Sequence, residues 1–178
     1  MEDFEPFREF ICTKLGENPE LRVICQVSDG LEAVRKGEEL QPDLVLLDVG
    51  LPTLNGIEAA RQIRKLAPDS KIVFVSQECS ADVVEEAFRL GAVGYVAKTD
   101  AGSDLPRAVS AALRGETFVS TRFADHDFTG VFHAKTRKAS TVMRSSRRSN
   151  RRRTRSRSAM RHSSILMIDV YWMKLRGS

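Results

Sequence analysis

A chain of 178 residues, 42% of them hydrophobic, has room for one domain of ordinary size plus an appendage and enough apolar content for a packed core. No run of about 18 apolar residues is present and the N-terminus is acidic. These features exclude a membrane-spanning helix and a secretion signal, so we expect a cytoplasmic protein. The cysteines Cys12, Cys25 and Cys79 lack metal-binding spacing, and we expect reduced core residues.

The net charge of +4 hides two segments of opposite charge. Residues 1–133 contain 14 Lys and Arg against 23 Asp and Glu, a net charge of −9, whereas residues 134–178 contain 14 against one, a net charge of +13. Such a shift marks physically different segments. We therefore predict a domain over residues 1–120 and an Arg/Ser-rich, disordered tail over residues 121–178.

Helical and strand periodicities alternate along the domain. The patterns predict helices over residues 7–15, 31–39, 57–66 and 81–90, a helix with apolar face Leu105 to Leu113 that Ser103 caps, and strands over residues 21–27, 44–47, 71–76 and 94–98. Alternating strands and helices of this length predict an α/β fold with a doubly wound parallel sheet and right-handed crossovers.

Three of the predicted strands end in a polar residue. Leu44 to Leu47 contain no polar side chain, which is typical of a parallel strand covered on both faces, and Asp48 follows them. Ser76 and Lys98 end two later strands. Because ligands bind beyond the carboxyl ends of parallel strands, we expect Asp48, Ser76 and Lys98 to converge in one cleft.

The acidic pair Glu2-Asp3 together with Asp48 offers three carboxylates that we expect near one point. Three clustered carboxylates form the hard oxygen environment that Mg²⁺ prefers. A metal ion, an ammonium group and a hydroxyl can together neutralise and hold a phosphoryl group during its transfer to a carboxylate. The sequence therefore indicates phosphoryl chemistry at Asp48.

The order of these residues resembles the receiver domain of bacterial two-component response regulators. The resemblance covers about residues 2–118 and rests on the Glu2-Asp3 pair, the loop from Asp48 to Gly56, Ser76, and Tyr95 three residues before Lys98. The run Gly-Ala-Val-Gly-Tyr-Val-Ala-Lys ending at Lys98 is most similar to the NarL/FixJ-LuxR branch. The resemblance implies a flavodoxin-like sheet and a signalling function.

Within that resemblance, Asp48 is the phosphoacceptor and takes its phosphoryl group from a histidine kinase or phosphotransfer protein. Ser76 is expected to hydrogen-bond the phosphoryl group and Lys98 to pair with it. Tyr95 is the expected switch residue, which turns inward when Ser76 moves toward the phosphate. This change is a shift between two receiver states and catalyses nothing beyond self-phosphorylation and self-dephosphorylation.

The resemblance also implies a metal site and partners. Glu2, Asp3, Asp48 and the backbone carbonyl of Gly50 are the expected Mg²⁺ ligands. A homodimer is a further state that the family permits, whereas no membrane partner is expected.

One departure concerns the first strand of the family, which normally precedes the acidic pair. The family's strand order of 2-1-3-4-5 puts that strand inside the sheet, so its loss leaves residues 21–27 and 44–47 without their shared neighbour. Three explanations stay open: a start further upstream, a damaged gene product, or another segment in its place. Ile165 to Val170 contains an apolar run ending in Asp169 and is one candidate for that segment.

The second departure is the missing output domain, since no set of helix-turn-helix patterns follows residue 118. The segment Arg144–Arg161 is low-complexity Ser/Arg sequence. It has two interpretations: nonspecific, salt-dependent binding of RNA or DNA, and a degenerate or frameshifted remnant, which we prefer. A truncated or degenerate regulator with a basic tail is therefore the alternative to a working switch.

A third hypothesis is an enzyme. Phosphatases of the haloacid-dehalogenase type also combine a strand-end Asp, Mg²⁺, a hydroxyl and a Lys. They carry a second Asp two residues after the nucleophile, where this chain has Gly50. That difference argues against a phosphatase.

Overall fold

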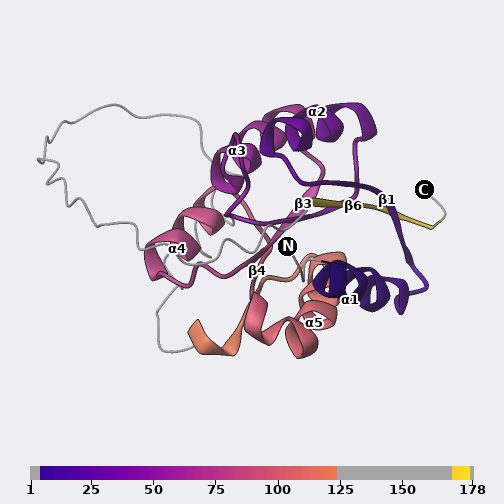
Figure 1. Cartoon of the computed structure of the whole chain (residues 1–178), viewed down its shortest axis with the longest axis vertical. Helices are drawn as coiled ribbons and strands as arrows, with labels where there is room; N and C mark the ends of the chain where they lie inside the picture. Colours follow the sequence, from indigo (N-terminus) through magenta and orange to yellow (C-terminus); the bar gives the residue numbers. More distant parts are fainter. Residues whose placement is uncertain (1–4, 124–169, 177–178) are drawn as a thin grey trace, which may run out of the picture.

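The computed structural model describes residues 5–123 and 170–176 (Figure 1). Its helices are α1 (Glu5–Gly16), α2 (Gly30–Leu40), α3 (Gly56–Leu66), α4 (Ala81–Arg89) and α5 (Ala101–Leu113), with short 3₁₀ helices η1 (Lys98–Asp100) and η2 (Thr121–Phe123). Its strands are β1 (Leu21–Val27), β2 (Leu44–Leu47), β3 (Lys71–Ser76), β4 (Gly94–Ala97), β5 (Phe118–Val119) and β6 (Val170–Leu175). The predicted α/β class is confirmed.

The strands form one sheet in the order β1-β6-β2-β3-β4-β5. The pairs β2–β3, β3–β4 and β4–β5 are parallel, whereas β6 runs antiparallel to both of its neighbours. Since β6 opposes both β1 and β2, those two strands point the same way. The carboxyl ends of β1 to β5 therefore lie along one edge of the sheet, as the sequence predicts.

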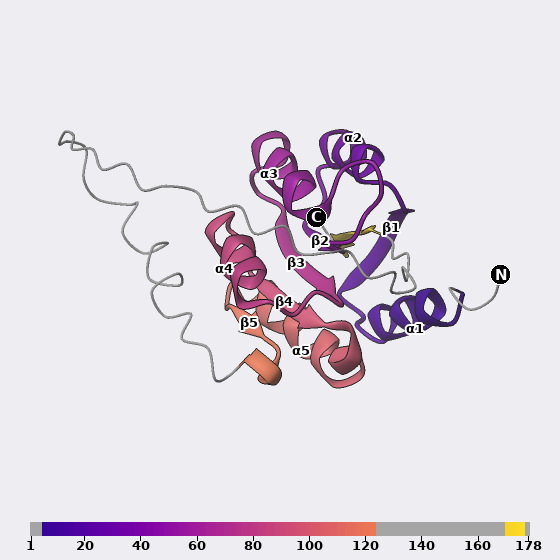
Figure 2. The same cartoon turned by 60° about the vertical axis from the view of Figure 1, so that its left-hand side comes forward.

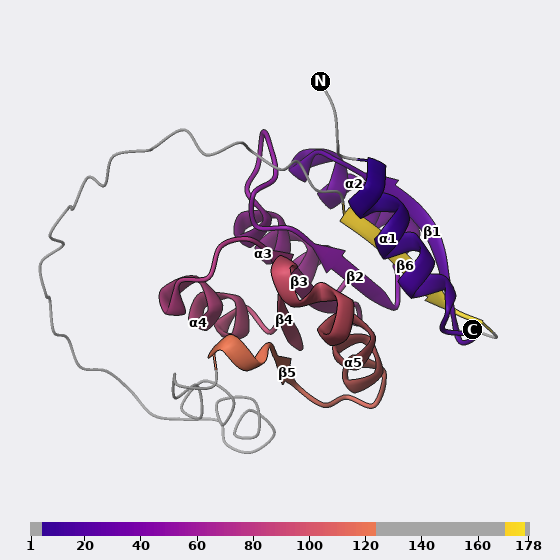
Figure 3. The same cartoon turned by 60° about the horizontal axis from the view of Figure 1, so that its bottom comes forward.

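Helices cover both faces of the sheet (Figures 2 and 3). Buried residues of α2, α3 and α4 pack on one face, and those of α1 and α5 pack on the other. β2 is buried at every position, which explains its uninterrupted apolar sequence. No helix in the part of the chain that the structure describes is both long and apolar enough to span a bilayer.

The position between β1 and β2, which we call the central strand position, is occupied by β6 (Figure 3). Of the candidate segment Ile165 to Val170, only Val170 belongs to this strand, and residues 165–169 lie outside the described residues. The strand that fills the position lies further along the chain and runs antiparallel. It contains aromatic, β-branched and apolar residues that fit a strand buried on both faces.

Three further expectations need correction. The predicted boundary between domain and tail at residue 120 is wrong for η2 and for β6. Phe123 and the first four residues of β6 are buried in the domain. The rest of the expected tail, including Arg144–Arg161, lies outside the described residues. Ser103 lies within α5 rather than at its cap, since the helix begins at Ala101. Cys12 is exposed and the other two cysteines are half-buried, so they are not core residues.

Candidate functional site

The site is built around Asp48, the first residue after β2. Although it follows the strand at the carboxyl edge of the sheet, its side chain is only 2% exposed. Its Oδ2 lies 3.0 Å from the Nζ of Lys98, which follows β4 and is itself buried. β3 lies between β2 and β4, so the parallel topology brings together two residues that are far apart in sequence.

The ion pair of Asp48 and Lys98 is held in a water-poor environment. Burial lowers the pKa of the Lys98 ammonium, because a charged group loses hydration there, and the neighbouring Asp48 carboxylate acts in the opposite direction. The second carboxylate oxygen, Oδ1 of Asp48, is buried and has no hydrogen-bond partner among the described residues. Burying an anionic oxygen without a hydrogen-bond donor costs free energy. This oxygen is therefore a candidate for contact with a ligand or a reacting group.

The loop from Asp48 to Gly56 is fixed by close backbone contacts. The Gly56 amide donates to the carbonyl of Val49 at 2.9 Å, and Asn55 caps α3 by accepting from the amide of Glu58 at 3.0 Å. A Cβ on Gly56 would lie 1.8 Å from the backbone oxygen of Asp48. Gly56 is therefore required for space, because only a residue without a side chain lets α3 begin against the Asp48 backbone.

We expect Gly56→Ala to destabilise the domain by about 3 kcal/mol, since backbone atoms must move to relieve the overlap. Gly102→Ala is the matched control, because Gly102 is an exposed residue of α5 whose added Cβ would meet nothing closer than 3.9 Å. The control should be neutral or stabilised by up to about 1 kcal/mol through helix propensity. Urea unfolding followed by circular dichroism measures both, and equal stabilities would contradict this account of Gly56.

Ser76 and Tyr95 lie beside each other at the same edge. Ser76 ends β3 and pairs in register with Ala97, the residue before Lys98. Its Oγ accepts a hydrogen bond from the Glu78 amide at 3.1 Å, while the Tyr95 hydroxyl donates to the Glu78 carbonyl at 2.7 Å. Burial raises the pKa of the Tyr95 phenol, and a hydrogen bond with Ser76 acts in the opposite direction. The Tyr95 side chain is thus buried, with its hydroxyl directed at the loop after β3.

Aromatic neighbours hold Tyr95 in that orientation. Phe74 of β3 stacks on its ring at a centroid distance of 5.9 Å, and Phe123 of η2 meets it edge-on at 5.7 Å. All three rings are nearly inaccessible to solvent. Sequence reasoning did not single out Phe123, because this residue lies in the segment that was assigned to the tail. Its contact partner Tyr95 lies in β4.

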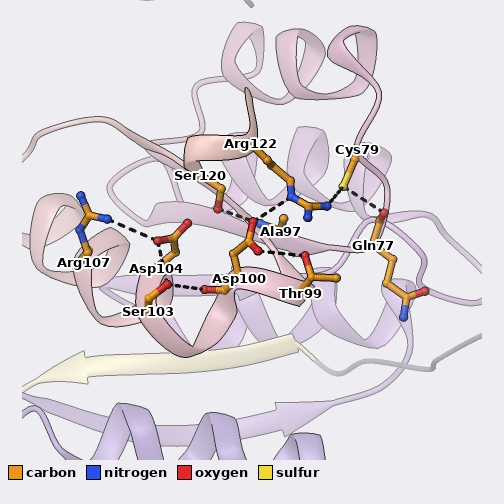
Figure 4. Close-up of polar contacts among 10 residues, drawn as sticks. All are labelled: Gln77, Cys79, Ala97, Thr99, Asp100, Ser103, Asp104, Arg107, Ser120 and Arg122. Carbon is orange, nitrogen blue, oxygen red and sulfur yellow. Dashed lines mark hydrogen bonds and ion pairs between the residues drawn. The ribbon is translucent and has the colours of Figure 1, made fainter. Parts of the chain in front are cut away.

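A second group missed from the sequence surrounds Arg122 of η2 (Figure 4). Its guanidinium pairs with Asp100 at 2.8 Å and donates to the Cys79 sulfur at 3.6 Å. Nearby, Ser120 Oγ accepts from the Ala97 amide at 3.1 Å. Arg122 therefore ties η2 to the loop that follows Ser76 and to η1, which begins with Lys98.

The predicted metal ligands are placed only in part. Asp48 has its unpartnered oxygen, and Gly50 is exposed and so near that an added Cβ would lie 3.5 Å from Asp48 Oδ2. Glu2 and Asp3 lie outside the described residues. No group of three or more His, Cys, Asp or Glu residues suited to a metal occurs among residues 5–123 and 170–176. The described donors fit a hard cation, but they form an incomplete ligand set.

Comparison with known proteins gives a consistent family. Residues 1–110 match the family described as the response regulator receiver domain. The transcriptional regulatory protein LiaR of Bacillus subtilis is 31% identical over 134 residues, which are 75% of this chain and 64% of that protein. DevR/DosR of Mycobacterium tuberculosis, a DNA-binding transcriptional activator, is 33% identical over 70% of this chain and 57% of its own length. The chain thus spans somewhat over half the length of these relatives.

A solved structure gives the same result for the fold. The response regulator domain of Thermotoga maritima CheB has a TM-score of 0.54 and 32% identity, and the match covers 61% of this chain and 86% of that domain.

Proposed function

The chain belongs to the response regulator receiver family, and from this premise we propose that it is a phosphorylation-controlled switch whose phosphoacceptor is Asp48. The observation that carries the proposal is the buried, unpartnered Oδ1 of Asp48 beside the buried ammonium of Lys98. This arrangement leaves one carboxylate oxygen available as a nucleophile. The other oxygen is held by a cation that can also stabilise the incoming phosphoryl oxygens.

The proposed step moves a phosphoryl group from a phosphohistidine of a sensor kinase or phosphotransfer protein to Asp48. A carboxylate oxygen of Asp48 forms a bond to phosphorus as the bond between phosphorus and the histidine nitrogen breaks. The nitrogen keeps the electron pair of the broken bond, and the imidazole leaves. Lys98 pairs with the charge on the phosphoryl oxygens, and the Ser76 hydroxyl donates a hydrogen bond to one of them.

Mg²⁺ is the proposed cofactor of this step, and when bound it would neutralise the negative charge shared by the phosphoryl group and the carboxylates. Asp48 and the backbone carbonyl of Gly50 are the described residues that would hold it. Glu2 and Asp3 complete the proposed ligands. Their part in the site stays a prediction because they lie outside the described residues.

The proposed switch couples Ser76 to Tyr95. A hydrogen bond from Ser76 to the phosphoryl group would shift the loop after β3, in which Glu78 bonds to both residues. The change would then alter the balance between inward and outward orientations of Tyr95. The buried Tyr95 side chain would correspond to the inward state.

Phosphate incorporation from a small-molecule phosphodonor tests the proposal. We expect Mg²⁺-dependent labelling of the wild-type chain that hydroxylamine releases, as it does for an acyl phosphate. Asp48→Ala should lose at least 100-fold of the label. Asp69→Ala, which removes an exposed carboxylate, is the matched control and should label normally. Equal labelling of the Asp48 variant, or a wild type that takes up no label, would disprove the assignment.

A further inference from the structure

The contacts of β6 are those of a ligand enclosed by the rest of the sheet. Val170, Tyr171, Trp172 and Met173 are each at most 2% exposed. Val170 and Trp172 face the apolar cluster beneath α2 and α3, whereas Tyr171 and Met173 face the cluster beneath α1 and α5. One short strand thus completes both halves of the core, and its side chains alternate between them.

Polar contacts fix the register of the strand. The amide of Leu175 donates to the Asp43 carboxylate at 2.9 Å, and the amide of Asp43 donates to the Met173 carbonyl at 2.9 Å. On the other side, the amide of Arg176 donates to the carbonyl of Glu20 at 2.9 Å. These bonds hold the end of β6 to the residues just before β2 and β1, in addition to the sheet ladders themselves.

The receiving surface is shaped for this segment. Gly37 of α2 faces the indole of Trp172, and an added Cβ there would lie 3.2 Å from Trp172 Cη2. The absence of a side chain at Gly37 therefore makes room for the ring. In addition, Val45 and Leu46 of β2 pair with Trp172 and Tyr171. The chain arrives at this position from Phe123 only after residues 124–169.

We propose that the central strand position is a binding site for an apolar β-strand, and that the segment Val170–Leu175 is its intramolecular ligand, able to dock and leave without unfolding the rest of the domain. Binding by strand addition uses main-chain hydrogen bonds for affinity and alternate side-chain pockets for specificity. Both are present here. The covalent connection through residues 124–169 raises the effective concentration of the strand and keeps it docked.

Docking of β6 controls the candidate phosphorylation site, a consequence that rests on the proposed function. β6 pairs with β2, whose next residue is Asp48, and Tyr171 lines a small cavity with Leu47 and Asp48. Without β6, β2 has no neighbour on that side and Asp48 loses its rigid support. An undocked strand should therefore lower phosphate labelling at Asp48 at least 10-fold.

The test uses the full chain with a recognition sequence for a site-specific protease inserted between Asn150 and Arg151. After cleavage, we expect the two fragments to elute together in gel filtration. Trp172 is the chain's single tryptophan, so its fluorescence should keep the blue-shifted emission of a buried indole. A fluorescent peptide of residues 162–178 added in excess should then replace the cleaved fragment.

Peptide variants supply the matched controls and avoid misfolding of the domain. Met173→Asp puts a charge at a fully buried position and should compete at least 10-fold less well. Lys174→Ala changes a half-buried side chain that lies 3.8 Å from Asp43, and this peptide should compete within about twofold of the original. Equal competition by the two peptides would show nonspecific adhesion and overturn the proposal.

Other outcomes also overturn it. If the cleaved fragment departs and the thermal midpoint of the remainder does not fall, β6 is not a ligand of the folded domain, because a bound ligand stabilises the fold that holds it. If cleavage unfolds the whole domain, β6 is an inseparable part of the fold. If the fragments stay together but even the uncut chain takes up no phosphate, the strand-binding site is supported and only the proposed function of Asp48 is refuted.

Discussion

Trp172→Ala should destabilise the protein by about 3–5 kcal/mol, one of the largest effects expected of any single substitution in this chain. The indole is fully buried between β1 and β2 and packs over Gly37. Truncation to alanine removes the largest side chain of β6 and leaves a cavity that helices on a rigid sheet cannot fill. A domain with a total stability of about 5–15 kcal/mol would lose a large part of it.

The indole nitrogen of Trp172 lowers the expected destabilisation only slightly. It has no hydrogen-bond partner among the described residues, so the native state already bears the cost of burying its N–H. Replacement by alanine removes that cost together with the packing, and Trp172→Phe should therefore be far milder than Trp172→Ala. This comparison separates the contribution of ring volume from that of the polar atom.

Urea unfolding followed by far-ultraviolet circular dichroism measures the effect, since fluorescence is lost with the only tryptophan. Leu31→Ala is the control, because Leu31 is 52% exposed and its truncation should cost below about 1 kcal/mol. A Trp172→Ala protein as stable as the Leu31 control would mean that β6 contributes little to the core. The place of β6 within the sheet would then be wrong.

The parts of the fold that were predictable from the sequence are those encoded by local periodicity. β1, β2 and β3 have the predicted bounds, and the polar ends of β2 and β4 meet as the parallel topology requires. β6 is different, because its paired residues lie between 125 (Leu46 to Tyr171) and 154 (Leu21 to Leu175) positions away in sequence. The apolar character of the C-terminal region was recognisable, whereas its register and direction depend on cross-strand contacts that no local pattern contains.

The site was predictable to a similar degree. Asp48 and Lys98 could be inferred as neighbours since both follow buried parallel strands. The contact of Arg122 with Asp100 and that of Phe123 with Tyr95 could not, because η2 follows a two-residue strand too short to show a period. These contacts depend on how η2 packs against β4 and η1, which lie earlier in the chain.

Lys98→Met should also be strongly destabilising, by about 3 kcal/mol, although it replaces a buried charge by an apolar side chain of similar length. The reason lies in what remains: Asp48 would be a buried carboxylate without its counter-charge, and its Oδ1 already lacks a partner. Removing one member of a buried pair costs more than removing both. Phosphate labelling should fall at least 10-fold as well, since Lys98 is the cation beside the proposed nucleophile.

A double-mutant cycle with Asp48→Asn distinguishes this electrostatic cost from lost packing. Asp48→Asn alone should be milder than Lys98→Met, because burial already lowers the pKa of Lys98 and the amine can lose its proton when the carboxylate is gone. The double variant should be more stable than Lys98→Met by about 2 kcal/mol, since no unpaired charge is left in the site. Additive losses in urea unfolding would contradict this result. They would mean that the two groups stabilise the domain separately, so the 3.0 Å contact would not couple the end of β2 to the end of β4.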